Sequence, residues 1–570
     1  MPSLLDTRID GSTTALTAAG GLAALVPFTL NGVQVPMVAS APPALPAYFA
    51  HFCAQHGDAT FIVDGDERLS FAQVHAAAER VARALIAGYG VKRGDRVGIA
   101  MRNAPSWIVL YMGTLMAGGC ATLINGWWQG NELVAGIDEV GAVLVFADAP
   151  RAKRLADEGY AGAAKIVTLD IGQPLEAALA PVFAGGRADV ALPALTGDDL
   201  ATILFTSGST GQSKGAFSTH RAVVQATFNY IVQALMTLQL ATEDGTIKPN
   251  PPQHATLLSV PLFHVTGEVP MMLVSFAIGR KIVLMPKWDV VRAMELIQGE
   301  KVTNFTGVPL MSFELMSHPD RHNYDLSTLQ SMAGGGAPRP IEHVRRIAAE
   351  FPNAPPALGY GLTETNGIGC GNFSTNYQEK PNSTGRASAP LVDLAILDDD
   401  GNKLPQGERG EVSIRSVANF SGYWNRPEAT AACMTADGYF RSGDIGYLDE
   451  DGYLFIVDRK KDIIIRGGEN ISCQEVEAAI YEHPAVNEAC VFGLPDERLG
   501  EVVGAVYHCH DGQSVSAEVL SDFLRERLAS FKVPLKMWAE ADHLPRLGTE
   551  KIDKVGLRKR FQAEWATENA

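Results

Sequence analysis

Cysteine is scarce in this 570-residue chain: seven are present, widely scattered, with no Cys-x-x-Cys pair. An odd number of dispersed thiols argues against the disulfide framework of a small secreted protein. We therefore expect free thiols, a reducing compartment and a cytoplasmic location.

Long apolar runs are also missing. No stretch of about 18 uninterrupted apolar residues occurs, so we expect no transmembrane span, while peripheral membrane contact stays open. The apolar run near the N-terminus is broken by Gly20, Gly21 and Pro27, and Asp6 and Asp10 precede it. These features are unlike a signal peptide.

Basic residues are fewer than acidic residues. Lys and Arg total 47 against 64 for Asp and Glu, which gives a formal net charge of −17, and no basic stripe is present. Such a chain repels a phosphate backbone. We therefore expect no nucleic-acid partner.

Apolar residues are plentiful, at 46%, and charged residues make up 19% of the chain. This composition predicts a globular protein, and 570 residues are too many for one core, so at least two domains are expected. Ser70 and Gln73 form a capping-box signature, and the apolar residues that follow are spaced as on one face of a helix, which predicts that a helix begins here. Strands and helices then alternate, as in a mainly parallel α/β sheet, at Ala201–Phe205 (strand), from Arg221 (helix), Thr256–Val260 (strand), Lys281–Leu284 (strand) and Val290–Gln298 (helix).

The texture changes after about Ser383, where short strands alternate with turns rich in Gly and Asp. The charged run Asp458–Asp462 then interrupts the apolar pattern. We predict a large N-terminal α/β domain over 1–458, including a β subdomain over about 383–458, and a small α+β domain over 459–570. A solvated charged turn is the alternative interpretation of the run.

The loop TSGSTGQSKG, residues 206–215, follows an expected buried strand and precedes a helix expected near His220. Its glycines let backbone amides turn inward, its hydroxyls offer donors, and Lys214 adds a positive charge, so it suits a polyphosphate. Its spacing is not that of a Walker A motif, which disfavours P-loop ATPases. A flexible linker is the alternative.

Six motifs follow one another in the order seen in AMP-forming acyl-CoA synthetases: TSGSTGQSKG, AGGGAP (333–338), YGLTET (360–365), YFRSGD (439–444), DRKKDIIIRGGENI (458–471) and LPRLGTEKIDK (544–554). From about residue 50 onward the chain resembles this adenylate-forming superfamily, which also includes luciferase and nonribosomal peptide adenylation domains. The resemblance implies that a carboxylate attacks the α-phosphorus of ATP, and that the acyl-adenylate is then transferred to coenzyme A. It also implies that the small C-terminal domain is mobile.

The resemblance implies that three parts of the chain bind the triphosphate of ATP and its metal ion. The phosphate loop would hold the β- and γ-phosphates through Thr206, Ser207, Gly208, Ser209, Thr210, Gly211 and Lys214. Thr363 would touch the α-phosphate, and Glu364 would hold Mg²⁺, which favours hard oxygen ligands.

The nucleoside would be held by further motif residues. Gly335, Gly336 and Ala337 would let a purine lie against backbone, and Tyr360 would stack on it. Asp444, expected in a turn after a glycine, would accept the ribose hydroxyls with help from Arg459. Taken singly, each of these residues also fits an ordinary turn or strand end.

The C-terminal motifs would serve both half-reactions. Lys551 would be inserted beside the carboxylate and the α-phosphate, Lys461 would be the hinge, and the face around Gly467 and Gly468 would serve the coenzyme A step. Glu550 stands where the family usually has Gly, and Ser213 where it usually has Pro. Neither departure removes a charge that the chemistry requires.

The residues that would bind the acyl group are harder to identify from the sequence. His264 stands where the family places a gating residue, and the apolar segments 270–279 and 303–311 fit either an acyl pocket or the core. Trp127 and Trp128 receive no role, and the first 45 residues receive no assignment.

We therefore expect an ATP-dependent acyl-CoA synthetase acting on a hydrophobic carboxylic acid, fatty or aryl, with a homodimer left open. An amino-acid adenylation domain is disfavoured because His264 stands where an Asp would hold the substrate amine. A luciferase-like oxygenase or another acyl acceptor remains an alternative. A noncatalytic nucleotide- or acyl-binding protein is disfavoured because Lys551 and Glu364 are both present.

Overall fold

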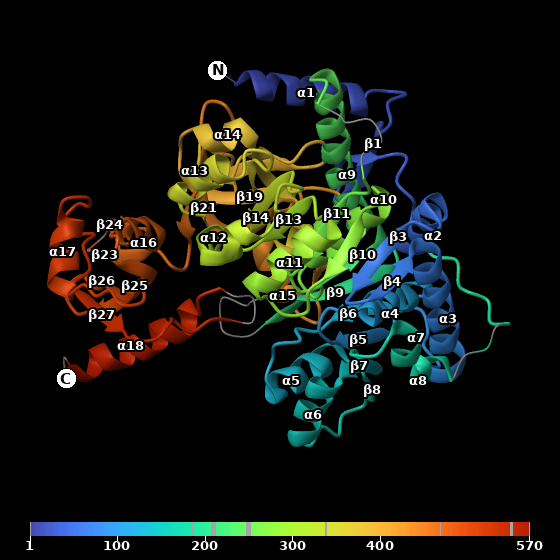
Figure 1. The fold of residues 1–570 in the computed structure, drawn as a ribbon. Coiled ribbons are helices and arrows are strands. Elements are labelled where there is room, and N and C mark those ends of the chain that lie inside the picture. Colours follow the sequence, from blue (N-terminus) through green and yellow to red (C-terminus); the bar gives the residue numbers. More distant parts are fainter. Residues whose placement is uncertain are drawn as a thin grey trace. The chain divides into compact units, whose positions relative to one another are not determined.

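The computed structural model describes residues 2–184, 187, 189–206, 213–246, 252–336, 339–467, 469–547 and 551–568 (Figure 1). These described residues form two compact units. The first contains the chain up to Leu394 together with Ile414–Phe440, and the second contains Ala395–Ser413 together with the chain from Arg441 onward. The boundary expected between residues 458 and 459 stays a prediction.

One sheet of the first unit is parallel in its centre and antiparallel at one side. Its strand order is β20 (Gly422–Tyr423), β10 (Lys214–Thr219), β9 (Leu200–Thr206), β6 (Cys120–Leu123), β5 (Arg96–Ala100), β7 (Leu144–Asp148) and β8 (Lys165–Leu169). The strand predicted at 201–205 is confirmed as β9.

A second sheet of the first unit is also parallel in its centre, with antiparallel strands at both edges. Its order is β17 (Arg386–Ala387), β16 (Gly369–Phe373), β15 (Pro356–Gly361), β14 (Ser331–Gly335), β13 (Asn304–Gly307), β11 (Ala255–Leu258), β12 (Lys281–Leu284), β3 (Thr60–Asp64) and β4 (Glu67–Ser70). The strand predicted at 281–284 is confirmed, and β11 ends two residues earlier than predicted. The mainly parallel α/β fold is confirmed.

Helices connect these strands. The capping box predicted from Ser70 and Gln73 is present at the start of α3. The helices of this unit are α1 (Leu4–Thr17), α2 (Leu45–His56), α3 (Phe71–Tyr89), α4 (Pro105–Met116), α5 (Gly130–Val140), α6 (Ala149–Asp157), α7 (Leu175–Ala178), α8 (Ala180–Phe183), α9 (His220–Glu243), η1 (Gly267–Leu273), α10 (Val274–Ala277), α11 (Val290–Glu300), α12 (Pro309–Ser317), η2 (Pro319–Asn323), α13 (Ile341–Glu350), η3 (Thr363–Thr365), α14 (Ser374–Glu379) and α15 (Pro427–Cys433). Among the described residues, no helix has the length and apolarity needed to cross a bilayer.

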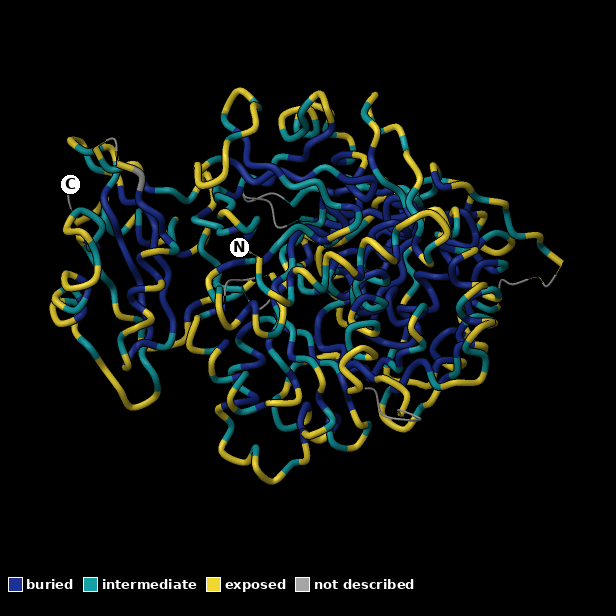
Figure 2. Tube along the Cα trace, turned by 90° about the horizontal axis from the view of Figure 1, so that it is seen from above, coloured by how far each residue is buried: buried dark blue, intermediate teal, exposed yellow. Residues whose placement is uncertain are grey.

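Aromatic side chains anchor the core of the first unit. Phe61 stacks on Phe71 with ring centroids 4.3 Å apart, and Phe276 lies 4.4 Å from Phe61. Trp128 packs edge-on against Phe205 at 4.9 Å, and its ring occupies the space where a side chain at Gly136 would lie. Trp127 and Trp128, for which no role is predicted, thus lie partly buried against the core. Figure 2 shows the buried segments of the chain in dark blue beneath exposed loops.

The second unit is α+β. A four-stranded sheet, most of whose residues belong to this unit, has the order β18 (Asp393–Leu397), β19 (Gly410–Arg415), β21 (Phe440–Leu448) and β22 (Leu454–Arg459), which agrees with the β texture predicted after Ser383. Its strands β21 and β22 pair antiparallel. A further sheet has the order β24 (Glu469–Ile471), β23 (Ile464–Arg466), β26 (Gly500–Cys509) and β25 (Val486–Asp496), with β27 (Lys536–Glu540) paired to β26. It is accompanied by α16 (Cys473–Tyr481), α17 (Ala517–Arg525) and α18 (Lys554–Glu568).

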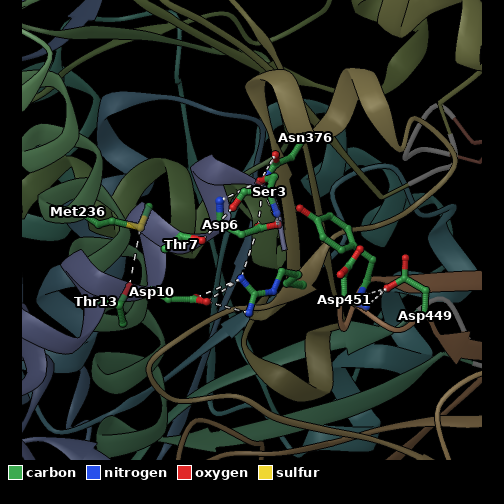
Figure 3. A network of polar contacts seen from close by, with 11 residues as sticks. Ser3, Asp6, Thr7, Asp10, Thr13, Met236, Asn376, Asp449 and Asp451 are labelled. Atoms are coloured by element: carbon green, nitrogen blue, oxygen red, sulfur yellow. Dashed lines mark hydrogen bonds and ion pairs between the residues drawn. The ribbon is translucent and has the colours of Figure 1, made fainter. Parts of the chain in front are cut away.

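The N-terminal residues fold as α1 and a hairpin of β1 (Leu25–Leu30) and β2 (Val33–Val38). Asp6 of α1 is almost fully buried, and it accepts hydrogen bonds from the Asn376 side chain at 3.0 Å and from the Ser3 amide at 3.1 Å (Figure 3). Arg386 pairs with Asp6 at 3.4 Å and with Asp10 at 3.1 Å. Polar contacts thus fasten α1 to α14 and β17.

We predict that Asp6→Ala lowers the free energy of unfolding by about 1–3 kcal/mol, because the buried amide of Asn376 loses its acceptor. Asp10→Ala is the matched control. The Asp10 side chain is 54% exposed, so its loss is expected to cost about 0–1 kcal/mol. Urea unfolding of both variants measures this, and equal losses would contradict the assignment.

A carboxylate lies inside the core of the first unit. Glu268, in the π-helical turn η1, is fully buried, and its Oε1 accepts a hydrogen bond from the Tyr111 hydroxyl at 2.7 Å. Oε2 has no hydrogen-bond partner among the described residues. Burial raises the pKa of Glu268 from 4.5 to about 7, because the ionised form is poorly solvated there.

Because the pKa of Glu268 is higher in the folded chain, the folded state holds its proton more tightly than the unfolded state does. Its contribution to stability is therefore complete below about pH 4.5 and is lost as the pH rises through about 7. Gln is neutral at every pH. Thermal unfolding from pH 5 to 8 should show the melting temperature of Glu268→Gln gaining on that of the unsubstituted chain as the pH rises. A difference that does not change with pH would refute this.

Candidate active site

The chain after β9 differs from the prediction in one respect. The predicted loop leads into strand β10, which pairs antiparallel with β9, and helix α9 begins at His220 only after that strand. The expected strand–loop–helix order is therefore wrong, because residues 214–219 add a strand to the sheet edge. Thr206 ends β9, while five predicted phosphate-binding residues lie outside the described part of the chain: Ser207, Gly208, Ser209, Thr210 and Gly211.

Lys214 is the first residue of β10, and its neighbours are determined by the pairing of β10 with β20. The two strands run antiparallel with Ala216 opposite Tyr423, and the Trp424 amide donates to the Gly215 carbonyl at 2.7 Å. This register places the Lys214 Nζ 4.9 Å from the centroid of the Tyr423 ring. A cation over an aromatic face at this distance is attracted by the ring quadrupole.

Glu364 faces the same tyrosine. The Tyr423 hydroxyl donates to Glu364 Oε1 at 2.6 Å, and the Phe420 amide donates to the Glu364 carbonyl at 2.8 Å. Burial and the neighbouring Glu364 raise the pKa of Tyr423 well above its ordinary value, so the hydroxyl stays protonated and remains a donor. Lys214 and Glu364, predicted as separate phosphate and metal residues, therefore both contact one side chain.

The turn that carries Thr363 and Glu364 is held from several sides. The Thr365 hydroxyl donates to the Ile368 carbonyl at 2.6 Å, and the Asn366 side chain donates to the Ala418 carbonyl at 2.7 Å. Asn366 has φ of 49°, a left-handed conformation that Asn tolerates better than most residues. Thr363 is partly exposed in this turn.

The expected purine-binding residues lie at the carboxyl ends of neighbouring parallel strands. Gly335 of β14 pairs with Gly359 of β15, and Tyr360 follows. A Cβ on Gly359 would meet no atom within 4 Å, and Gly336 has φ of +75°, which favours glycine. Bare backbone beside an aromatic ring fits a flat aromatic base. Ala337 lies outside the described residues.

His264 follows β11, at the carboxyl edge of the same sheet. It is partly exposed, and its ring centroid lies 5.3 Å from that of Phe263. The apolar segments after it are mostly core: the chain buries Met271, Met272, Phe276 and Phe305 almost completely. The core interpretation of these residues is therefore the correct one.

In the second unit, the structure brings Asp444, Arg459 and Lys551 together. Asp444 lies inside β21 rather than in the predicted turn, and it is the cross-strand neighbour of Arg459 in β22. The Arg459 Nε lies 2.6 Å from Asp444 Oδ1. Desolvation, with a smaller effect from Arg459, lowers the pKa of Lys551, while Asp444 opposes the shift.

The predicted hinge residue, Lys461, is exposed in the turn between β22 and β23. Gly467 follows β23 with φ of +60°, and its amide donates to the Leu499 carbonyl at 2.7 Å. Gly468 lies outside the described residues.

The first unit offers a limited donor set for a metal. Within the described ranges, no three His, Cys, Asp or Glu side chains gather as a metal-binding group. Mg²⁺ commonly takes only one or two protein carboxylates and fills its shell with water and substrate phosphates. The single Glu364 carboxylate, held by the Tyr423 hydroxyl, fits that mode of binding.

Tyr423 is the residue that sequence reasoning missed. It lies in GYWN, outside the six motifs, and its short strand gives little periodic signal. Its contact with Glu364 joins positions 59 residues apart, which only the sheet pairing reveals.

Comparison with known proteins identifies the family of the chain. The family model described as "AMP-binding enzyme" matches residues 49–424, and "AMP-binding enzyme C-terminal domain" matches 475–551. A long-chain-fatty-acid–CoA ligase, FadD13 of Mycobacterium tuberculosis, is 35% identical over 500 residues, which are 87% of this chain and 94% of that protein.

A feruloyl-CoA synthase of Amycolatopsis is 32% identical over 507 residues, covering 88% of this chain and 96% of the relative. Among solved structures, ATP-bound MatB from Rhodopseudomonas palustris superposes with a TM-score of 0.79 at 28% identity, covering 91% of this chain and 99% of that one. The chain belongs to the AMP-binding enzyme family and is an AMP-forming acyl-CoA synthetase, an acid–thiol ligase of the adenylate-forming superfamily.

Proposed function

We propose that this enzyme activates a hydrophobic carboxylic acid, fatty or aryl, and transfers the acyl group to coenzyme A. ATP and coenzyme A are the cosubstrates implied by the family. The observation that carries the proposal for this chain is the convergence of Lys214 and Glu364 on Tyr423. That arrangement holds a cation and a carboxylate against the same side chain, and binding of a metal–polyphosphate complex requires both kinds of group.

The first half-reaction joins two anions. The acid's carboxylate oxygen attacks the α-phosphorus of ATP, the α–β phosphoanhydride bond breaks, and pyrophosphate leaves. Lys214 screens the polyphosphate charge, and Thr363 offers a hydroxyl from its partly exposed turn to the α-phosphate. Lys551 supplies positive charge where the carboxylate meets the phosphorus.

Adenine and ribose are assigned to separate groups of residues. The backbone at Gly335 and Gly336 and the ring of Tyr360 take the adenine. Asp444 accepts the ribose hydroxyls, and Arg459, ion-paired to it at 2.6 Å, orients its carboxylate.

Glu364 would hold Mg²⁺ with water and phosphate oxygens as the remaining ligands. The bound ion would neutralise charge that develops on the leaving pyrophosphate. The protein's own part is to orient the Glu364 carboxylate through the hydrogen bond from Tyr423.

In the second half-reaction the coenzyme A thiol attacks the acyl carbon and AMP leaves. We propose that the turn at Lys461 is the hinge about which the C-terminal domain moves between the two half-reactions. The backbone around Gly467 and Gly468 would line the path of the thiol, and His264 would gate that path. The exposed position of Lys461 supports a hinge, because backbone dihedral changes there disturb few buried contacts.

The acid itself is proposed from the relatives, two of which are named for a long-chain fatty acid and for ferulate. Both acids are largely apolar. The seven cysteines are all free thiols in the structure, which supports a cytoplasmic location.

The substrate class can be tested with a panel of acids, by measuring pyrophosphate release with and without coenzyme A. Medium- and long-chain alkanoates or cinnamates should give pyrophosphate and a coenzyme A-dependent thioester, whereas acetate and malonate should give little of either. Pyrophosphate without thioester for every acid would indicate another acceptor. Oxygen consumption with light emission would indicate a luciferase-like enzyme.

The role of Lys551 is tested by separating the half-reactions. We predict that Lys551→Ala slows adenylate formation by roughly 10²–10³-fold, the usual cost of losing a preorganised charge, and leaves thioester formation from preformed acyl-adenylate nearly intact. Lys559→Ala, an exposed lysine of α18, is the control and should leave both rates unchanged. Equal slowing of both half-reactions by Lys551→Ala would rule out the assigned role.

A further inference from the structure

The hydroxyl of Tyr423, at the edge of the sheet, contacts a buried carboxylate. It lies 2.6 Å from Glu364 Oε1, and Tyr423 and Glu364 are 9% and 8% exposed. A short hydrogen bond from a hydroxyl to an ionised carboxylate is among the strong, orientation-dependent ones. In this environment the donor restricts the direction in which the carboxylate presents its oxygens.

The ring of the same residue has a second contact. The Lys214 ammonium lies 4.9 Å from its centroid, at the point where the predicted phosphate loop rejoins the sheet. One side chain therefore touches both a carboxylate and a cation, through its hydroxyl and its aromatic face. Moving the ring would shift both groups together.

Tyr423 is itself firmly held. Its amide donates to the Thr430 hydroxyl at 2.9 Å, and the Thr430 hydroxyl donates to the Arg426 carbonyl at 3.1 Å. Phe420 packs edge-on against its ring at 5.0 Å. Pairing of β20 with β10 fixes its backbone. A group fixed this way is preorganised and can orient others without rearranging during the reaction.

We propose that Tyr423 is a positioning residue for the adenylation step, setting the Glu364 carboxylate and the Lys214 ammonium in the relative geometry that a divalent cation and a polyphosphate require together. It touches neither reactant and acts through these two side chains. This inference rests on the proposed function, in which Glu364 holds Mg²⁺.

Tyr423→Phe tests the hydroxyl alone, because the ring beneath Lys214 is kept. The Mg²⁺ concentration for half-maximal pyrophosphate formation should rise roughly tenfold, the lower end of what losing an outer-shell partner costs a metal site. Thioester formation from preformed acyl-adenylate should be unchanged. Tyr423→Leu removes the ring as well, and it should also raise the KM for ATP.

A matched control is available in Tyr439. Its hydroxyl donates to Asp393 Oδ2 at 2.6 Å, the same chemistry at the same distance, in a pair to which no substrate role is assigned. Tyr439→Phe should leave the Mg²⁺ requirement unchanged. If both Phe variants shifted it equally, a general loss of stability would explain the effect and the positioning role would fall.

Glu364→Gln separates this inference from the proposed function. If Glu364→Gln leaves the Mg²⁺ requirement unchanged, the metal role of Glu364 is wrong. If Glu364→Gln raises the requirement but a folded Tyr423→Phe does not, only the positioning role is wrong. The double variant Glu364→Gln/Tyr423→Phe should have the same Mg²⁺ requirement as Glu364→Gln alone, because the Tyr423 hydroxyl acts through that carboxylate. A further increase in the requirement would overturn the proposal.

The double variant also covers the case in which Tyr423→Phe fails to fold because a buried charge has lost its donor. With Gln at position 364 no charge is buried, so Tyr423 can be replaced in that background without this penalty. An Mg²⁺ requirement equal to that of Glu364→Gln supports the proposal, and a different one overturns it.

Discussion

The pairing of β10 with the two-residue strand β20 is the contact on which the geometry of the first unit's site depends. Side chains alternate between the faces of a strand, so a slip of one residue would turn Tyr423 away from Glu364 and Lys214. The backbone bonds from Ser421 to Phe217 and from Trp424 to Gly215 oppose such a slip. Two hydrogen bonds at the edge of a sheet thus keep Tyr423 in contact with both Lys214 and Glu364.

Local signals in the sequence predicted much of the fold. The capping box at Ser70 and Gln73 marks where α3 begins, and the apolar run at 281–284 coincides with β12. Prediction failed at residues 214–219, where Gly215 and the alternating small side chains resemble the end of a loop. Their strand conformation comes from pairing with β9 and β20, which a local pattern does not contain.

The motifs identified candidate residues but not their partners. The motifs predicted that Asp444 and Arg459 act together; the register of β21 and β22 makes them cross-strand neighbours, while their joint role stays a prediction. Tyr423 was missed because its contacts join distant parts of the chain, and a single tyrosine in a short strand has no distinctive spacing. The interior of the phosphate loop, residues 207–212, stays a prediction because it lies outside the described residues.

The family match begins at residue 49, yet the residues before it are integral to the first unit. The amide side chain of Gln225 in α9 exchanges two hydrogen bonds with the backbone of Val38, and Asn376 and Arg386 bind carboxylates of α1. Gln225 is only 3% exposed. A chain trimmed to the family boundary would leave these polar groups unpaired and uncover one side of α9. The first consequence would be a poor yield of folded enzyme, which could be mistaken for a loss of catalytic residues.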